Sequence, residues 1–188
     1  MYYKYFLSHW PLSLVSLLLF TTMTHAQMLD FTNPLTVNEM WVVNDGVMGG
    51  VSQSRVRLDS EGVLFEGIVS LDNGGGFASV RSPITIPVGS PTLNVMLRGD
   101  EKIYKLVLRT DSSPRSPLYQ AEFFATRDWK THHFLPSDFK ASFRGRPVYT
   151  PELVFSAVHE IGILIANQQS GTFRLQLKNV QFVGDTLR

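Results

Sequence analysis

The feature that most constrains the fold is the alternation of apolar and polar residues along several short runs of the chain. In residues 62–71, Val63, Phe65 and Val69 occupy one set of alternate positions, and Glu66 belongs to the other set. Successive side chains of a β-strand point to opposite faces, so this period predicts a strand with one buried face. The same period recurs in residues 92–97, 103–110 and 171–182.

Clusters of Gly, Pro, Asn and Asp separate these runs, and no stretch has the apolar spacing of a long helix. Many short strands divided by such turns are typical of two antiparallel sheets packed face to face. The sequence therefore predicts an all-β sandwich in a single domain. A short helical turn is expected at residues 135–139, with Ser137 as its cap.

The amino-terminal segment has the pattern of a secretory signal peptide. Lys4 precedes an apolar run at residues 12–20, and small residues follow up to Ala26. The apolar run is shorter than the ~20 residues that a membrane-spanning helix needs. We expect residues 1–26 to be a cleaved leader and residues 27–188 to be the domain, exported to a periplasmic or extracellular space. An uncleaved anchor is the alternative.

Charge and cysteine content limit the partners and the sources of stability. The chain has 17 basic and 16 acidic residues, and loss of Lys4 with the leader would balance them. A balanced charge argues against nucleic acid or an anionic membrane surface as the main partner. Cysteine is absent. Stability must therefore come from a packed core rather than from disulfides, and the amino terminus cannot be lipid-modified on a cysteine.

A glycine-rich stretch at residues 41–54 reads WVVNDGVMGGVSQS. A phosphate-binding loop would need Lys before Ser or Thr at the start of a helix, and a helix-loop-helix calcium loop would need several carboxylates. Asp45 is the one carboxylate here. The stretch instead predicts a strand that enters a tight turn, with Val47 and Met48 either tucked into the end of the sandwich or displayed for contact. Residue chemistry alone favours the structural role over recognition.

Two further loops are candidates for binding. The run LDNGGGFASVRS at residues 71–82 predicts a glycine-rich turn before a strand, with a structural calcium at its carboxylate as the alternative. The run FRGRPV at residues 143–148 places Arg144 and Arg146 on either side of a glycine. These guanidinium groups could grip a carboxylate, pair with Asp45 and Asp100, or remain solvated.

Catalytic and metal-binding patterns are weak. His132 and His133 are neighbours in an expected strand and should point to opposite faces. The chain has no G-x-S-x-G motif around a serine nucleophile. We therefore expect no enzyme activity, no metal and no cofactor. Trp129 and Tyr119 are either core residues or platforms on which a sugar ring stacks.

Five blocks of the sequence, in this order, resemble the complex I intermediate-associated protein family, named after a mitochondrial assembly factor of NADH:ubiquinone oxidoreductase. They are WVVNDGVMGGVSQS, FEGIVSLDNGGGFASVRS, LRGDEKIYKLVLRT, YQAEFFATRDWKTHHFLPSDFKASFRGRPV and IGILIANQQSGTFRLQLKNV, within residues 29–183. The resemblance implies a galactose-binding-like jelly-roll sandwich and a non-catalytic role in assembling protein complexes, without a cofactor. The residues that carry it are Trp41, Asn44, Asp45, Gly46, Met48, Gly49, Gly50, Gly75, Gly76, Phe77, Arg81, Gly99, Asp100, Arg144 and Gly145.

Two hypotheses follow from these observations. The first is an exported binding and assembly module with a protein partner, whose glycine-rich loops, with Arg144 and Arg146, form the recognition edge. Export would separate it from the mitochondrial client of the family, so the partner itself differs. The alternative is a secreted carbohydrate-binding module, by analogy with other jelly rolls.

Overall fold

The computed structural model describes residues 28–111, 113 and 116–183. The predicted leader at residues 1–26 lies outside these residues. None of the helices in the described ranges is long and apolar enough to span a membrane.

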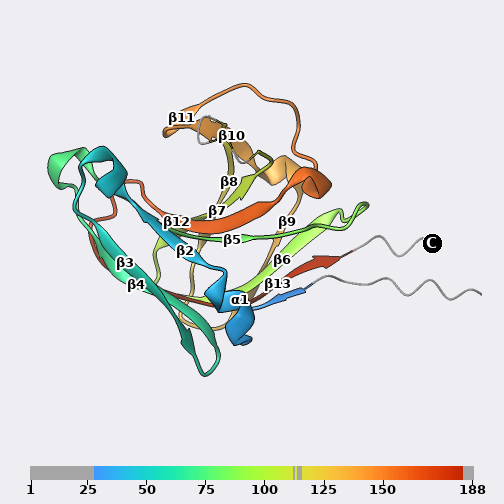
Figure 1. Ribbon diagram of the computed structural model, residues 1–188, viewed down its shortest axis with the longest axis horizontal. Coiled ribbons are helices and arrows are strands. Elements are labelled where there is room, and N and C mark those ends of the chain that lie inside the picture. Colours follow the sequence, from blue (N-terminus) through green and yellow to red (C-terminus); the bar gives the residue numbers. More distant parts are fainter. Residues whose placement is uncertain (1–27, 112, 114–115, 184–188) are drawn as a thin grey trace, which may run out of the picture.

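Two antiparallel sheets form the body of the protein (Figure 1). Sheet A has the order β3-β4-β13-β6-β9, with β1 also paired to β13, and sheet B has the order β11-β10-β8-β7-β12-β5-β2. The strands of sheet A are β1 (Met28–Asp30), β3 (Gln53–Asp59), β4 (Gly62–Val69), β6 (Thr92–Arg98), β9 (Lys130–Phe134) and β13 (Gly171–Val183). The strands of sheet B are β2 (Trp41–Asn44), β5 (Ala78–Pro83), β7 (Ile103–Arg109), β8 (Leu118–Phe124), β10 (Lys140–Phe143), β11 (Arg146–Pro147) and β12 (Glu160–Ile165).

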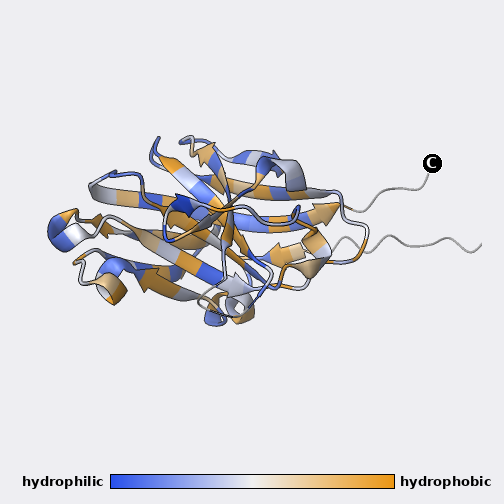
Figure 2. Ribbon diagram, turned by 90° about the horizontal axis from the view of Figure 1, so that it is seen from above, coloured by the Kyte–Doolittle hydropathy of each residue, from blue (hydrophilic) through white to orange (hydrophobic). Residues whose placement is uncertain are grey.

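The alternation in the sequence is the alternation of buried and outward side chains in the strands. Leu93, Val95 and Leu97 of β6 are completely buried between the sheets, as are Leu106 and Leu108 of β7. Figure 2 shows the matching exchange of hydrophobic and hydrophilic colour along the strands. Each fully buried side chain of this size contributes about 1.5–3 kcal/mol relative to an exposed one, so these residues dominate the stability of the sandwich. The predicted all-β class and sandwich are confirmed.

The longest strand, β13, pairs with β4 along its first half, Gly171 to Leu177, and with β6 along its second, Gln176 to Val183. A register shift lies between Leu177 and Asn179. Before it, Leu175 and Leu177 face the core, and after it Val180 and Phe182 do. The extra residue of a β-bulge moves the inward positions from odd to even numbers, so a strict period of two could not follow the whole strand.

Short helical pieces connect the strands: α1 (Pro34–Asn38), η1 (Asp45–Met48), η2 (Asp72–Gly74), η3 (Pro136–Asp138) and η4 (Phe155–Ala157). The predicted turn at residues 135–139 is η3, but its cap is not Ser137. The carboxylate of Asp138 instead accepts a hydrogen bond from the Leu135 backbone N–H at 2.7 Å. Helix α1 is too short for a helical period to show in the sequence, and the Asn33 side chain caps it by accepting from Leu35 N–H.

Candidate functional site

The two glycine-rich loops meet at the buried carboxylate of Asp45, the first residue of η1. Asp45 is 1 % exposed. Its Oδ1 accepts from the Ser52 N–H at 2.9 Å, and its Oδ2 accepts from the Ser52 hydroxyl at 2.5 Å. The same Oδ2 accepts from the N–H groups of Gly76 at 2.7 Å and Phe77 at 3.3 Å. One carboxylate therefore ties η1, the start of β3 and the loop before β5 into one unit.

Glycines make room for this carboxylate. A Cβ on Gly50 would lie 2.4 Å from the Cγ of Asp45, and a Cβ on Gly75 would lie 2.5 Å from its Oδ2. Gly49 ends η1 in the left-handed conformation at φ 93°, which favours glycine. The glycines in this part of the sequence are thus explained by a close approach and a turn.

Hydrogen bonding controls the charge of Asp45. Burial alone would raise the pKa of its carboxyl group. The bonds from the Ser52 hydroxyl and from the N–H groups of Gly76, Ser52 and Phe77 outweigh burial and lower the pKa below its usual value. Asp45 is therefore a negative charge at neutral pH, held by the donors of Ser52, Gly76 and Phe77.

The same loop displays an apolar tip. The side chains of Val47 and Met48 are 77 % and 65 % exposed, although η1 itself is fixed at Asp45 and Gly49. This settles the alternative that the sequence left open, since the two residues are displayed and not tucked into the end of the sandwich. The backbone of this loop is already held in place and need not be ordered when a partner covers the tip, and the flexible Met side chain can adapt to the partner surface.

The remaining predicted site residues fall into separate places. Asn44 ends β2 and accepts from the Ser54 hydroxyl, and Gly46 is exposed within η1. Asp100 lies in the turn between β6 and β7, where its carboxylate accepts from the Tyr104 hydroxyl at 2.8 Å and from the Arg174 N–H at 2.9 Å. Of the predicted set, the structure joins Asp45 with Gly50 and with the segment from Gly75 to Phe77.

Arg144 and Arg146 lie on the exposed β10–β11 hairpin, away from both carboxylates proposed as their partners. Arg144 adopts φ 50° in the turn, with its guanidinium 5.4 Å from the Phe143 ring centroid. Asp45 and Asp100 are bound to the other donors described above. Figure 1 shows this hairpin at the top of the molecule and η1 at its left-hand side.

Arg81 belongs to a charged group on the outer face of sheet B. Its Nη1 donates to Glu160 Oε1 at 3.2 Å, and Arg109 Nε lies 3.2 Å from the same oxygen. Burial is the main reason that the pKa of Arg81 is lowered. The nearby charge of Arg109 lowers this pKa further, whereas the charge of Glu160 raises it. Sequence reasoning missed Glu160 and Arg109. The sequence marked these two residues only as outward-facing positions of β12 and β7, next to the buried Ile161 and Leu108 in the same strands.

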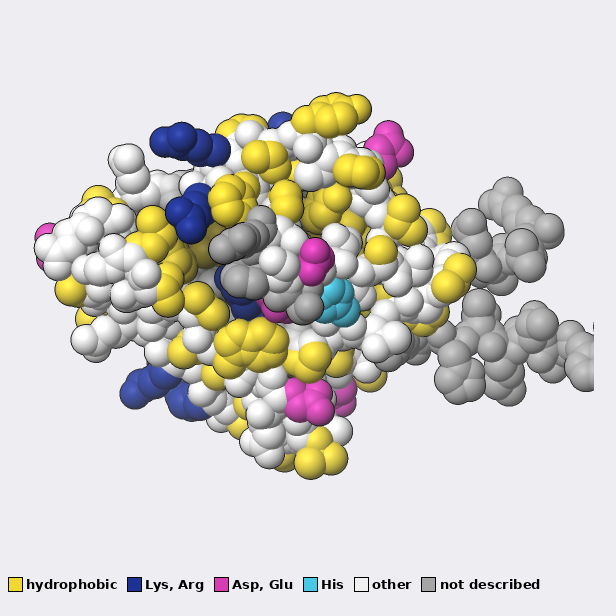
Figure 3. Space-filling model, turned by 45° about the horizontal axis from the view of Figure 1, so that its top comes forward, with side chains coloured by type: hydrophobic (Ala, Val, Ile, Leu, Met, Phe, Trp, Pro, Cys, Tyr) yellow, Lys and Arg dark blue, Asp and Glu magenta, His cyan; other side chains and the backbone are white. Residues whose placement is uncertain are grey.

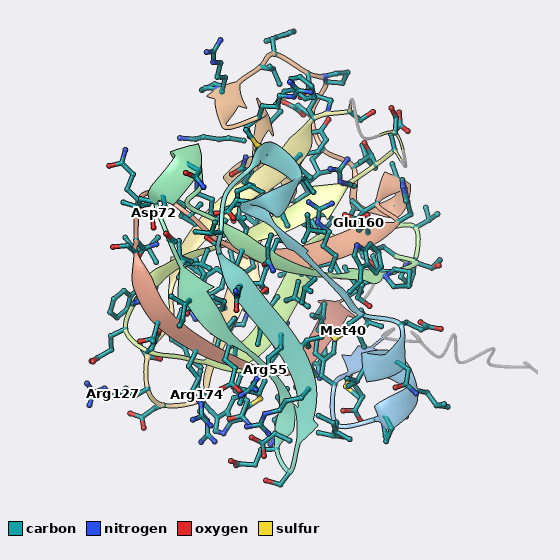
Figure 4. The ribbon with its side chains drawn as sticks, turned by 60° about the vertical axis from the view of Figure 1, so that its left-hand side comes forward. Met40, Arg55, Asp72, Arg127, Glu160 and Arg174 are labelled. Atoms are coloured by element: carbon teal, nitrogen blue, oxygen red, sulfur yellow. The ribbon has the colours of Figure 1, made fainter. Side chains whose placement is uncertain are left out.

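Trp41 lies beside this group. It pairs directly with Arg81 across β2 and β5, so the two side chains share the outer face, and Trp41 is 41 % exposed. Figure 3 shows basic and acidic side chains close together on one face of the molecule, with hydrophobic side chains around them. In Figure 4, Glu160 lies on the other side of the sandwich from Arg55 and Arg174.

The aromatic residues first considered for sugar stacking have other contacts. The Arg98 guanidinium lies 4.7 Å from the ring centroid of Trp129, and the Lys178 ammonium lies 5.6 Å from it. Tyr119 packs against the core and donates its hydroxyl to the Pro151 carbonyl at 3.1 Å. Both rings thus have structural contacts, and of the two tryptophans in the described ranges Trp41 is the more exposed.

The two neighbouring histidines point in opposite directions, as predicted. His132 packs with the rings of Phe123 and Phe134, whereas His133 Nδ1 lies 2.7 Å from Asn94 Oδ1 on the outer side of sheet A. His132 also lines a groove of about 650 Å³ beside β9. Within the described ranges, no three His, Cys, Asp or Glu side chains gather closely enough to hold a metal ion.

Comparison with solved structures shows the fold. A family 11 carbohydrate-binding module from Clostridium thermocellum, in complex with a β-1,3-1,4-mixed-linked tetrasaccharide, superposes with a TM-score of 0.61 at 14 % identity, over 85 % of this chain and 95 % of the module. The family 11 module of a cellulosomal cellulase of Clostridium thermocellum gives 0.61 at 13 % identity, over 87 % and 98 %. An agarase gives 0.50 at 12 % identity, over 83 % of this chain and 24 % of the enzyme.

Comparison of the sequence identifies a family. Residues 29–177 match the family described as Complex I intermediate-associated protein 30. No curated protein matches the chain.

Proposed function

The chain belongs to the Complex I intermediate-associated protein 30 family, and on that premise we propose that it is an exported module that holds a protein partner during the assembly of a complex. The family and the neighbouring carbohydrate-binding modules support a non-catalytic binding module. The assembly role is inferred from the family name and from the apolar tip of η1. Export is inferred from the leader-like pattern of residues 1–26.

The observation that carries this proposal is the exposure of Val47 and Met48 on a loop that Asp45 holds in place. Apolar side chains cost free energy when they remain in water, and a partner surface that covers them recovers it. Because the backbone beneath them is tied to β3 and to the loop before β5, the tip need not be ordered on binding. This combination suits a small and specific protein contact.

Capture of a partner from envelope extracts tests the proposal. We expect the wild-type chain to recover one defined protein, and Met48→Asp to lose it while melting at an unchanged temperature. Val88→Asp is the matched control, since Val88 is 90 % exposed in the connection between β5 and β6 and should leave capture intact. Equal recovery by Met48→Asp and the wild type, or no enriched protein at all, would remove the proposal.

A second candidate function is carbohydrate binding on the outer face of sheet B. The observation that favours it is Trp41, which is 41 % exposed on the same outer face as Arg81, its direct partner across β2 and β5. Aromatic rings beside hydrogen-bonding groups suit the apolar faces and hydroxyl edges of sugars. Calorimetry against a glycan panel tests it, with Trp41→Ala expected to abolish the heat and Val88→Asp to preserve it. A silent panel would remove this candidate.

A further inference from the structure

We propose that the groove beside β9 binds an extended acidic segment of a protein partner, which pairs with the free edge of β9 and adds a strand to sheet A. This inference deepens the first proposed function, because it names a second surface for a protein partner and the chemistry of the segment that this surface takes. No residue of η1 lines the groove, so the surface is separate from the tip formed by Val47 and Met48.

The first observation is that one side of the sandwich is left open. β9 is the last strand of sheet A and pairs with β6 alone. In sheet B, β10 pairs with β8 at residues 118–120 and leaves residues 121–124 of β8 without a strand partner on that side, among the described residues. On the opposite side of the sandwich, the edge strands β2 and β3 contact each other. The free edges of β9 and of the second half of β8 are not closed in this way.

The second observation is that a groove lies between these two edges. Its volume is about 650 Å³, and it is lined by residues 121–124 of β8 and by residues 130 and 132–134 of β9. The rings of Phe123 and His132 meet between the sheets, with their centroids 5.1 Å apart. Neighbouring strands of a sheet lie about 4.8 Å apart, so a strand paired with β9 would enter the space of this groove.

The third observation is that the main chain of β9 has unused hydrogen-bonding groups at this edge. An edge strand turns alternate N–H and C=O groups away from its partner strand, and these groups form a template for one more strand. In the described part of the chain, no backbone group of residues 130–134 bonds to anything outside the pairing with β6. The strand has five residues, a length of about 17 Å, which sets the length of the segment that pairs with it.

The fourth observation is the charge of the groove, which favours an acidic segment. Lys130 and Lys140 both line the groove and are exposed, and neither forms an ion pair within the described ranges. The two carboxylates of the groove are already engaged, since Glu122 lies 3.5 Å from the Lys105 ammonium and Asp138 caps η3. A second copy of this edge would add further lysines, so charge complementarity favours an acidic partner over self-association.

Titration with a defined peptide, followed by nuclear magnetic resonance of the wild-type chain, tests the inference. The probe is Thr-Glu-Val-Glu-Val-Glu-Thr with blocked ends, and the matched peptide has glutamine in place of each glutamate. We expect the acidic probe to shift the backbone signals of residues 121–124 and 130–134. It should bind about fivefold or more tightly than the glutamine peptide, the effect of two exposed ion pairs, and rising salt should remove this difference.

Methylation of the peptide amides separates strand addition from a purely ionic contact. Alternate N–H groups of a paired probe would donate to β9, and the other set would point away from it. Methyl groups on one set should therefore abolish the shifts, whereas methyl groups on the other set should leave them in place. Equal binding of the two methylated probes, or equal loss, would overturn the pairing with β9.

Charge reversal locates the site on the protein. Lys130→Glu should weaken binding of the acidic probe about fivefold or more, because an attraction becomes a repulsion. Arg174→Glu is the matched control, since it changes the charge equally at an exposed position of β13 that does not line the groove. Melting temperatures show whether each variant is folded, and equal weakening by both variants would contradict a site at β9.

The remaining outcomes decide between occupants. No shift with any peptide, or equal binding of the acidic and glutamine peptides, would overturn the inference. A dimer of the wild-type chain that Lys130→Glu disrupts in sedimentation, without a response to peptide, would assign this edge to a second copy instead. The titration uses neither envelope extract nor an η1 variant, so its failure would leave the proposal for the η1 tip standing.

Discussion

The backbone N–H of Gly76 donates a hydrogen bond to the Asp45 carboxylate at 2.7 Å, across 31 residues of sequence. The bond joins the two glycine-rich loops through a side chain that is itself buried. Their glycines therefore serve one carboxylate, and the loops act as a single support beneath Val47 and Met48. Four predictions about stability follow from this support and from the histidine between the sheets.

Replacing the carboxylate of Asp45 should destabilise the fold. In Asp45→Asn, a neutral amide replaces the carboxylate. In the wild type, this carboxylate accepts hydrogen bonds from Ser52, Gly76 and Phe77. We expect a loss of about 3 kcal/mol, since hydrogen bonds to charged groups contribute about 1.5–3 kcal/mol each. Chemical denaturation measures it, and a loss below about 1 kcal/mol would contradict the role of the carboxylate.

The same carboxylate should make stability sensitive to acid. Its folded pKa lies below its unfolded value, so the folded state is stabilised fully above the unfolded pKa of about 3.9. That stabilisation is lost as pH falls below this value through the lower folded pKa. Denaturation curves at several acidic pH values should show the wild type converging on Asp45→Asn. A constant difference between the two chains would argue against it.

Two glycine substitutions in one loop should differ in effect. Gly50→Ala places a methyl group 2.4 Å from the Asp45 Cγ, and the carboxylate must shift away from its donors. We expect it to cost about 2 kcal/mol or more. Gly46→Ala is the matched control, because a Cβ there meets nothing within 4 Å. It should be neutral or stabilise by up to about 1 kcal/mol. Similar melting temperatures for the two variants would show that close packing against Asp45 does not restrict this loop.

His132 should weaken the fold as pH falls toward 6. Burial is the main reason that its pKa is lowered, with the charges of Lys130 and His133 adding to it. The unfolded chain therefore takes up a proton first, so stability is complete above about pH 6.5 and declines below it toward the folded pKa. His132→Phe should flatten this decline, because the ring already lies between Phe123 and Phe134. The readout is melting temperature between pH 5 and 8, and an unchanged slope would exclude His132 as the cause.

The sequence was most informative where a residue's role depends on its neighbours in the chain. The alternation in β6 and β7 reports burial on one face, and the glycines of the loops report tight turns. The partners of Asp45 and Arg81 were not predictable in this way. Gly76 meets Asp45, and Glu160 meets Arg81, only because β5 pairs with both β2 and β12. Strand register sets these contacts, and no local pattern encodes it. Trp129 was ambiguous for the same reason, since Arg98 comes from a different strand.

Site-specific photo-crosslinking in living cells tests the central claim most directly, namely that the η1 tip is the surface at which this module meets its protein partner. A photoreactive residue would replace Val47 in one variant and Val88, at the β5–β6 connection, in the other. We predict one defined crosslinked protein from position 47 and none from position 88. No product from position 47, or the same products from both positions, would contradict the account.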